Sequence, residues 1–316
     1  MPDILFIKTS SLGDVVHHMP ALTEARRMCA GARFFWLVEE SFAPLVALHP
    51  DVAGIVPVAW RRWRKSLYSH VTLAEIAGSL GTLRDRRYDE IVDSQGLLRS
   101  GAIARIAHGR RHGYDAGSIR EPLAAMFYDV RHNVSRDLHA IERNRLLTGK
   151  ALGYAPQGTA DYGLDRAALA PDRSGRYAVL LHATARAEKQ WAEDNWVALG
   201  KSIGVGGLEL VLSWGNETER ERAQRIAARL PQARVAQRQP LDAVARLIAG
   251  ASFVVGVDTG LLHVAAALGV PLVAIFAGSK PGLTGPVGAG AMVVLGAQGS
   301  PPTVGEVAAA VERIAP

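Results

Sequence analysis

The sequence contains a single cysteine, Cys29, among its 316 residues. One thiol cannot form an intramolecular disulfide, so the fold does not depend on disulfides and suits a reducing compartment. No stretch approaches the roughly 18 uncharged apolar residues that a transmembrane helix needs, and 289–295 is far too short. The N-terminal MPDILFIKTS also lacks the basic and apolar regions of a signal peptide. We therefore expect a protein that is made and kept in the cytoplasm.

Several cofactor-binding motifs are missing as well. No predicted strand is followed by GxGxxG with an acidic residue about 20 positions later, which weighs against a Rossmann dehydrogenase. No Walker loop occurs, so a site that hydrolyses ATP is not expected. The Arg- and His-rich stretch 108–145 contains no cysteine and no HExxH motif, so a zinc site is not expected either. The sequence thus requires no metal and no other cofactor.

The composition that remains is ordinary for a soluble globular protein, with 48% hydrophobic and 21% charged residues. The length suits two domains of about 150 residues each. Short apolar runs alternate with helical patterns in both halves, which predicts two doubly wound α/β domains. Proline and glycine gather between Gly153 and Arg176, so we expect the domains to cover 1–160 and 170–316. The terminal helix, 304–314, belongs to the second domain or packs back on the first.

A polar loop, KTSSLGD at 8–14, follows the first predicted strand. It precedes a predicted helix over 15–28, which Pro20 either kinks or begins. Because α/β sheets bind ligands at the carboxyl ends of their strands, Lys8 and Asp14 are candidate functional groups. The alternative for Asp14 is that it only caps the helix.

Positive charge is concentrated in the first half of the chain. The formal net charge is +6. Residues 1–155 hold 21 Lys and Arg against 16 Asp and Glu, whereas 156–316 hold 15 against 14. The densest basic segment is WRRWRK at 60–65, which is either a solvated surface or a clamp for the phosphates of an amphiphilic partner, because indole rings suit a membrane interface. A nucleic-acid groove would use the same residue types.

The segment FVVGVDTGLLHVAAAL, residues 253–268, predicts a buried strand that turns sharply into a helix. The N-terminus of a helix offers unpaired N–H groups and a partial positive charge, so it readily binds phosphate, and Gly260 lets an anion approach the backbone. The carboxylate of Asp258 would repel a phosphate beside it. We therefore expect this side chain either to cap the helix or to accept a hydrogen bond from a donor such as an amide or hydroxyl. His263 lies one turn into the helix. The alternative is a capped core helix with a satisfied histidine.

Six motifs, in this order, resemble those of the bacterial lipopolysaccharide heptosyltransferases of glycosyltransferase family 9. They are KTSSLGDVVH (8–17), RRWRK (61–65), DSQGLLRS (93–100), REPLA (120–124), EKQW (188–191) and VDTGLLH (257–263). The match spans about residues 3–285 and is most similar to the heptosyltransferase I branch. The resemblance implies a GT-B fold, in which two Rossmann-like domains face a central cleft. It also implies inverting transfer of L-glycero-D-manno-heptose from ADP-heptose to the first Kdo of Kdo2-lipid A.

In the second domain, the resemblance implies donor contacts from Thr184, Lys189, Glu219, Asp258, Thr259, Gly260 and His263. Lys189 matches a lysine that neutralises the diphosphate as ADP leaves, and a cation suits this task because charge grows on the leaving group in the transition state. Glu219 matches a carboxylate that binds the ribose hydroxyls; the alternative is a solvated glutamate at a helix end. Ala185 stands where relatives often carry a second hydroxyl, so one phosphate hydrogen bond is expected to be missing.

In the first domain, the resemblance implies acceptor contacts from Ser10, Gly13, Arg61, Arg62, Arg64, Lys65, Gln95 and Arg120. The cations among them are expected to hold the Kdo carboxylates and the lipid phosphates. Asp14 is the candidate general base, because inverting transfer needs a carboxylate that takes the proton of the acceptor hydroxyl. Asp93 is the alternative base.

Two other interpretations stay open. One is heptosyltransferase II, or a related ADP-sugar glycosyltransferase that acts on another lipopolysaccharide acceptor. The other is a nucleotide- or polyanion-binding module without catalysis. The expected partners are ADP-heptose, Kdo2-lipid A and the cytoplasmic face of the inner membrane, with peripheral attachment and no nucleic acid.

Overall fold

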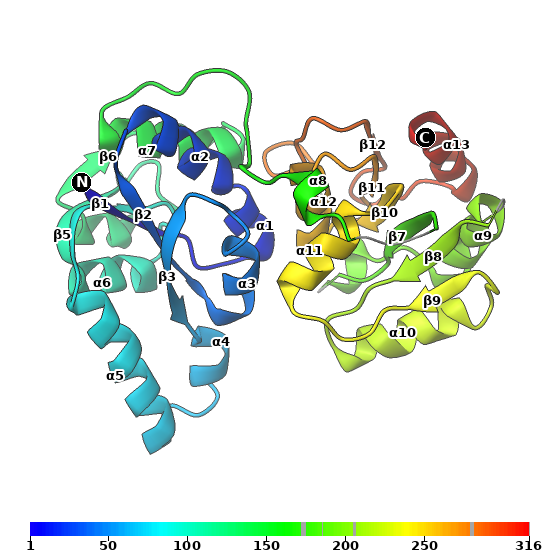
Figure 1. The fold of residues 1–316 in the computed structure, drawn as a ribbon, viewed down its shortest axis with the longest axis horizontal. Coiled ribbons are helices and arrows are strands. Elements are labelled where there is room, and N and C mark those ends of the chain that lie inside the picture. Colours follow the sequence, from blue (N-terminus) through cyan, green and yellow to red (C-terminus); the bar gives the residue numbers. More distant parts are fainter. Residues whose placement is uncertain (172–174, 185, 205–206, 279–280, 316) are drawn as a thin grey trace. The chain divides into compact units, whose positions relative to one another are not determined.

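Two parallel six-stranded sheets carry the fold, one in each half of the chain (Figure 1). The computed structural model describes residues 1–171, 175–184, 186–204, 207–278 and 281–315. Tertiary contacts divide the chain into unit 1, Met1–Gly163, and unit 2, Leu164–Pro316. This division lies between the ends of the two predicted domains.

The sheet of unit 1 has the strand order β3-β2-β1-β4-β5-β6, and all its strands are parallel. The order reverses between β1 and β4, which is the point where α/β sheets of this kind bind ligands. The apolar run of β1 is buried along its whole length, as expected for a strand covered on both faces. The strands are β1 (Asp3–Ile7), β2 (Arg33–Glu39), β3 (Val52–Val58), β4 (Arg87–Asp93), β5 (His108–Tyr114) and β6 (Val130–His132).

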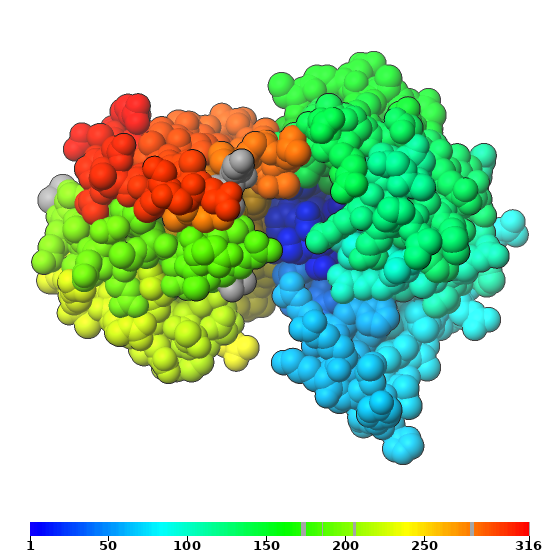
Figure 2. Space-filling model, turned by 180° about the vertical axis from the view of Figure 1, so that it is seen from behind, coloured from blue at the N-terminus to red at the C-terminus, as the bar shows by residue number. Residues whose placement is uncertain are grey.

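Helices cover both faces of this sheet. On one face lie α2 (Met19–Met28) and α7 (Ala140–Leu152), and His18 at the start of α2 packs edge-on against Phe6 of β1. On the other face, buried side chains of α4, α5 and α6 join those of the strands. In Figure 2 the light-blue and cyan atoms of the α4–α5 segment project from the body of unit 1. The remaining helices of unit 1 are α1 (Leu12–Val16), η1 (Glu40–Phe42), α3 (Ala43–Val46), α4 (Trp60–Trp63), α5 (His70–Arg84), α6 (Leu98–Ile106) and η2 (Pro122–Phe127).

Pro20 separates two helices where the sequence predicted one over 15–28. In the structure α1 ends at Val16 and α2 begins at Met19, so Pro20 occupies the second position of α2. A proline ring clashes with the carbonyl four residues earlier, which here belongs to Val16, and the first helix therefore ends there.

Unit 2 repeats the same topology. Its parallel sheet has the order β12-β11-β10-β7-β8-β9, which reverses between β7 and β10. Its strands are β7 (Tyr177–Leu181), β8 (Glu209–Leu212), β9 (Ala233–Val235), β10 (Phe253–Val257), β11 (Leu272–Ile275) and β12 (Met292–Leu295). Its helices are α8 (Arg166–Leu169), η3 (Ala187–Lys189), α9 (Glu193–Ile203), α10 (Glu217–Ala227), α11 (Leu241–Ala249), α12 (Gly260–Ala267) and α13 (Val304–Ile314).

The terminal helix α13 belongs to unit 2. Its apolar side chains Val307, Ala310 and Val311 are buried in the same core cluster as Trp196 of α9. It packs against α9 and against strands β10 to β12. Of the two alternatives left by the sequence, the structure shows the first, in that the apolar face of α13 is covered by its own sheet.

Candidate functional site

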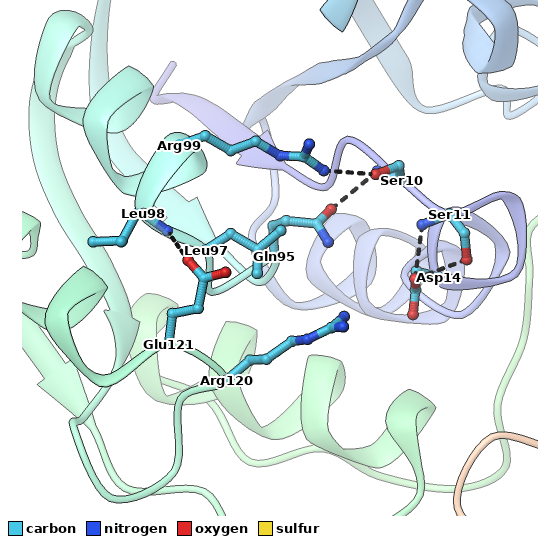
Figure 3. A pocket seen from close by; sticks show the side chains of 9 residues that line it. All are labelled: Ser10, Ser11, Asp14, Gln95, Leu97, Leu98, Arg99, Arg120 and Glu121. Carbon is cyan, nitrogen blue, oxygen red and sulfur yellow. Dashed lines mark hydrogen bonds between the residues drawn. The ribbon is translucent and has the colours of Figure 1, made fainter. Parts of the chain in front are cut away.

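The first site lies where the strand order of unit 1 reverses. Ile7 at the end of β1 pairs in register with Asp93 at the end of β4, so the polar loops that follow these strands start side by side. Together with the segment before η2, the loops form a pocket of about 500 Å³ (Figure 3). The pocket is lined by Ser10, Ser11, Asp14, Gln95, Leu97, Leu98, Arg99, Arg120 and Glu121.

Gln95 fixes the shape of the first loop. Its Oε1 accepts hydrogen bonds from the Thr9 N–H at 2.8 Å, from the Thr9 hydroxyl at 3.2 Å and from the Ser10 N–H at 3.0 Å. The next residue, Gly96, has φ +67°, a conformation in which a side chain would be strained, and a Cβ would also meet Ile119 at 3.0 Å. The turn therefore needs glycine, and it leaves the carboxamide of Gln95 beside the pocket.

Asp14 caps the helix, as one of the two alternatives predicted, and it also lines the pocket. It stands in the first turn of α1, where its Oδ2 accepts hydrogen bonds from the Ser11 N–H at 2.7 Å and from the Ser11 hydroxyl at 2.9 Å. This is a capping box, and it fixes the carboxylate against the backbone. Its Oδ1 accepts no hydrogen bond within the described part of the chain and remains available to a ligand in the pocket.

A buried lysine lies behind this carboxylate. The Lys8 ammonium donates to the Ser94 carbonyl oxygen at 2.7 Å, and the side chain is almost fully buried. Burial lowers the pKa of Lys8, while the carboxylates of Asp14 and Asp93 act in the opposite direction. Lys8 therefore ties the two loops together below the pocket.

Asp93, the alternative base, is fully buried and engaged by three donors. Its Oδ1 accepts from the N–H groups of Gln95 at 2.8 Å and Gly96 at 3.3 Å, and its Oδ2 accepts from the Tyr128 hydroxyl at 2.7 Å. Burial raises the pKa of this carboxyl. Asp93 does not line the pocket, so its geometry is that of a group that supports the loop from beneath.

Two basic side chains reach the pocket, of which the sequence predicted Arg120 but missed Arg99. Arg99 donates to the Ser10 hydroxyl at 3.1 Å. The guanidinium of Arg120 makes no hydrogen bond or ion pair with any described residue, so it is available to an anion. The signal for Arg99 was its place in the first turn of the helix that follows the polar loop. Gly13, a predicted acceptor contact, is buried in α1 and does not line the pocket.

The basic segment 60–65 lies apart from the pocket lining and divides into paired and unpaired cations. Arg62 donates to both carboxylate oxygens of Glu40 at 3.0 Å and to Glu75 at 2.5 Å. The guanidinium of Arg61 stacks over the Phe42 ring at 4.9 Å. Arg64 and Lys65 are exposed and form no ion pair with the described residues. Arg62 is therefore structural, and the other three cations remain available.

The two tryptophans of this segment do not form the expected amphiphilic clamp. Trp63 is only 3% exposed, belongs to the core of unit 1 and donates its indole N–H to Glu75 at 2.9 Å. Trp60 is half-buried against it, with ring centroids 5.5 Å apart. This part of the prediction is wrong, because the indoles are used to attach α4 to the sheet.

The second site lies where the strand order of unit 2 reverses, at the ends of β7 and β10. The Thr184 hydroxyl donates to the Asp258 carbonyl oxygen at 2.9 Å, which joins the two loops. The Lys189 ammonium lies 2.5 Å from Asp258 Oδ2, and both side chains are largely buried. Asp258 is thus the counter-ion of Lys189 rather than the cap of α12.

The N-terminus of α12 has the features of an anion site. Thr259 is the N-cap residue and has an extended backbone, and its side chain makes no capping hydrogen bond. The Thr259 hydroxyl therefore accepts no hydrogen bond from the first-turn N–H groups of α12. The positive end of the helix dipole lies beside Lys189. His263, one turn further, is 7% exposed.

Glu219 is more constrained than a solvated glutamate at a helix end. It accepts from the Gly215 N–H at 2.7 Å and from the Asn216 amide at 2.9 Å, at the start of α10. Each carboxylate oxygen retains capacity for a further donor, so the ribose contact stays a prediction. Ala185 lies outside the described residues. Among the residues that are described, no group of three His, Cys, Asp or Glu side chains could hold a metal ion.

Comparison with known proteins places the whole chain in one family. The model of Glycosyltransferase family 9 (heptosyltransferase) matches residues 79–310. Lipopolysaccharide heptosyltransferase 1 of Escherichia coli K12 is 43% identical over 294 residues, 92% of each chain. The protein of the same name from Pseudomonas aeruginosa PAO1 is 45% identical over 288 residues, 90% of this chain and 81% of the relative.

Solved structures of heptosyltransferases agree with this family assignment. E. coli heptosyltransferase WaaC with ADP superposes with a TM-score of 0.94 at 41% identity, over 99% of this chain and 100% of that one. WaaC with ADP-2-deoxy-2-fluoro heptose gives 0.88 at 40% identity, over 98% of each chain. The fold is therefore that of a GT-B glycosyltransferase. The chain belongs to glycosyltransferase family 9, the heptosyltransferases.

Proposed function

We propose that this glycosyltransferase transfers L-glycero-D-manno-heptose from ADP-heptose to the first Kdo residue of Kdo2-lipid A, with inversion, in the synthesis of the lipopolysaccharide inner core. The E. coli K12 and P. aeruginosa relatives named heptosyltransferase 1 match 90% or more of the chain. The observation that carries the proposal is the pairing of Lys189 with Asp258 beside the uncapped start of α12.

The donor diphosphate binds in unit 2. The first-turn N–H groups of α12 and the Thr259 hydroxyl hold its oxygens, and Gly260 permits close approach. Thr184 adds a further hydroxyl, while Glu219 and His263 contact the nucleoside and sugar portions. Lys189 moves from Asp258 to the diphosphate and stabilises the charge that develops on ADP as it leaves.

The acceptor binds in the pocket of unit 1. Arg120 binds a Kdo carboxylate, and Ser10 and Gln95 hydrogen-bond the sugar. Asp14 Oδ1 takes the proton of the acceptor hydroxyl, while the oxygen of that hydroxyl forms a bond to the anomeric carbon of the heptose. On the opposite face of the sugar the bond from the anomeric carbon to the diphosphate breaks, and its electron pair stays with ADP.

The lipid part of the acceptor lies near the unpaired cations Arg61, Arg64 and Lys65, which bind its phosphates. Within the described residues no helix is both long and apolar enough to cross a membrane. We infer a cytoplasmic enzyme that attaches peripherally to the inner membrane. The reaction requires no metal ion, no other cofactor and no nucleic acid.

The test is to incubate the enzyme with ADP-heptose and Kdo2-lipid A and to weigh the lipid product. We expect a gain of one heptosyl unit, with the anomeric configuration inverted relative to the donor by NMR. Extension of a mono-heptosylated acceptor, without extension of Kdo2-lipid A, would assign the protein to the second heptosyl step. Tight binding of ADP-heptose without product on any acceptor would indicate a non-catalytic binding protein.

A further inference from the structure

The solvent-exposed face of α5 carries almost no charge. Only Thr72 and Leu83 of this 15-residue helix are buried. Val71 is 68% exposed and Leu73 is 51% exposed, although both side chains are apolar. Helices that face water normally present charged and polar residues on the outer side, so this surface is unusual.

The turn that precedes α5 continues this apolar surface. Leu67 is 48% exposed and Tyr68 is 99% exposed. Further along the helix, Ala74, Ala77 and Gly78 are exposed as well. In Figure 2 this light-blue and cyan segment forms the projecting part of unit 1. We call residues 64–78 the α5 tip.

Charge in and beside the α5 tip has a single sign. Arg64 and Lys65 are exposed and unpaired among the described residues, and His70 begins the helix. The one acidic residue in this segment is Glu75, which is held by the Arg62 guanidinium at 2.5 Å and the Trp63 indole N–H at 2.9 Å. No free carboxylate therefore opposes the approach of an anionic surface.

We propose that the α5 tip is a docking surface for an anionic phospholipid bilayer. Leu67, Tyr68 and Val71 enter the interface between headgroups and acyl chains, where tyrosine is favoured because one end of its ring is apolar and the other is polar. Arg64 and Lys65 bind lipid phosphates at the same level. The inference rests on the proposed function, in that a lipid-linked acceptor is presented at a membrane.

A bilayer fits this surface better than a protein partner does. A Cβ placed on Gly78 or Gly81 would meet nothing within 4 Å, so this stretch of α5 is open and not covered by the rest of unit 1. Protein surfaces carry both signs of charge, whereas the α5 tip is complementary only to negative charge. A second copy of this chain would bring two sets of unpaired cations together.

The experiment measures sedimentation of the full-length enzyme with vesicles that contain no acceptor lipid. One set consists of phosphatidylcholine alone and the other of phosphatidylcholine with phosphatidylglycerol. We expect binding to the anionic vesicles, and a loss of about 10-fold or more in the variant L67S/Y68S/V71S, because binding scales with the apolar area inserted. The variant R64Q/K65Q should lose about fivefold per cation on anionic vesicles only.

The matched control is Leu283→Ser in unit 2, because Leu283 is 48% exposed, the same as Leu67. It should bind vesicles like the unchanged enzyme. Circular dichroism and thermal unfolding establish that the variants are folded, as expected for exposed positions. With a soluble, deacylated acceptor, L67S/Y68S/V71S should keep the original kcat/KM, which separates docking from catalysis.

Three outcomes would overturn the proposal: no binding of the unchanged enzyme to anionic vesicles, unchanged binding by the triple variant, or concentration-dependent dimerisation that the triple variant abolishes. A protein that binds anionic vesicles through the α5 tip yet extends no acceptor would support the docking surface and refute the proposed function. The two ideas therefore fail independently.

Discussion

The Lys189 ammonium and the Asp258 carboxylate lie 2.5 Å apart in unit 2, at the ends of η3 and β10. Both side chains are largely buried, so neither charge is fully solvated. A lysine held in this way is already positioned when a diphosphate arrives, but the diphosphate must compete with the carboxylate for it. We therefore predict that the pair sets the balance between donor binding and ADP release.

Replacing Lys189 by methionine should lower kcat by about 10²–10³-fold and weaken ADP binding, because the charge on the leaving diphosphate is no longer stabilised. Steady-state kinetics with ADP-heptose and calorimetric titration with ADP measure the two effects. The informative partner variant is Asp258→Asn, which should bind ADP several-fold more tightly because a carboxylate beside the diphosphate is removed. Weaker or unchanged ADP binding in Asp258→Asn would contradict the displacement of Asp258 by diphosphate.

Replacing Asp14 by asparagine should lower kcat by about 10²–10⁴-fold, which is the usual contribution of a general base. Asparagine retains an oxygen that can accept from the Ser11 N–H, so the start of α1 should stay folded. Donor affinity should not change, because Asp14 lies in unit 1 and the proposed donor site lies in unit 2. Titration with ADP and acceptor turnover test both statements.

Asp93→Asn provides the contrast, because Asp93 is buried and does not line the pocket. We expect reduced thermal stability, since the carboxylate accepts from Gln95, Gly96 and Tyr128, and a much smaller loss of kcat. Near-normal turnover in Asp14→Asn together with collapse of turnover in a folded Asp93→Asn would reverse the assignment of the base.

The central strands could be predicted from the sequence, whereas several polar elements could not. β1, β7 and β10 are short apolar runs because both faces of each are covered. β5 reads HGRRHGY and was not predicted, because its polar side chains find partners far away in the sequence. Arg111 pairs with Asp129 and His112 with Glu90, and no local pattern reveals such pairs. α5 was also missed, because its apolar residues are spread around the helix.

For the candidate site, the position of a residue directly after a strand predicted that it lies in the pocket. The sequence did not predict which of the charged side chains form ion pairs. Ser10, Asp14 and Gln95 follow strands whose carboxyl ends meet, so their gathering in one pocket follows from topology. The basic segment looked uniform in the sequence. Its division into a paired Arg62 and unpaired neighbours depends on where α5 brings Glu75, which only the packed structure fixes.

The division of the basic segment can be tested directly. The double variant R64Q/K65Q should raise the acceptor KM roughly 5- to 10-fold and flatten its dependence on salt, because two phosphate contacts are lost. The matched control Arg62→Gln should leave KM close to its original value and slightly lower the thermal midpoint, because Glu40 and Glu75 lose their cation. Equal effects on KM would show that all the cations contact the acceptor alike.

A buried histidine predicts how stability depends on pH. His49 is 1% exposed, its Nδ1 accepts from the Asp51 N–H and its Nε2 lies 2.9 Å from the Thr23 hydroxyl. Burial lowers the pKa of His49 from 6.5 to about 4. The folded state thus prefers the neutral ring of His49. The contribution of this residue to the free energy of unfolding is therefore complete above pH 6.5 and is lost as the pH falls towards 4.

We therefore expect the free energy of unfolding to fall by roughly 2–3 kcal/mol from this residue between neutral pH and about pH 4. Urea titrations at several pH values measure the slope. His49→Asn keeps an acceptor for the Asp51 N–H but cannot be protonated, so it should be less stable at neutral pH and lose less on acidification. An identical pH slope in the variant would exclude His49 as a cause.

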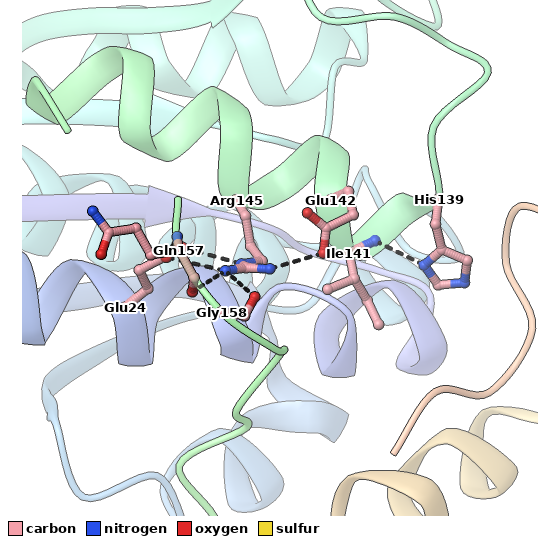
Figure 4. A network of polar contacts seen from close by, with 7 residues as sticks. All are labelled: Glu24, His139, Ile141, Glu142, Arg145, Gln157 and Gly158. Atoms are coloured by element: carbon pink, nitrogen blue, oxygen red, sulfur yellow. Dashed lines mark hydrogen bonds and ion pairs between the residues drawn. The ribbon is translucent and has the colours of Figure 1, made fainter. Parts of the chain in front are cut away.

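Arg145 joins two helices and the segment that leaves unit 1 (Figure 4). It donates to both oxygens of Glu24 at 3.1 Å and to the Gln157 carbonyl oxygen at 2.7 Å, while the Gln157 N–H donates back to Glu24 at 2.6 Å. The side chains of Arg145 and Glu24 are 5% and 11% exposed. The pair therefore holds the end of unit 1 in place.

Replacing Arg145 by methionine should destabilise unit 1 by about 3–5 kcal/mol, because Glu24 is left as an uncompensated buried charge. Chemical denaturation measures the loss. Adding Glu24→Gln removes that charge and keeps an acceptor for the Gln157 N–H, so the double variant should recover part of the stability. A double variant as unstable as the sum of the two single changes would show that the residues do not act as a pair.

The backbone passes from the first sheet to the second once, at Gly163–Leu164, and α13 keeps the terminus within the second. The strands of each sheet are thus encoded in one uninterrupted stretch of the gene. A single crossover at this join would exchange one complete sheet between homologues without separating any strand from its pairing partners. With the donor and acceptor sites divided between the units as proposed, we expect sugar preference and acceptor preference to be inherited and recombined separately.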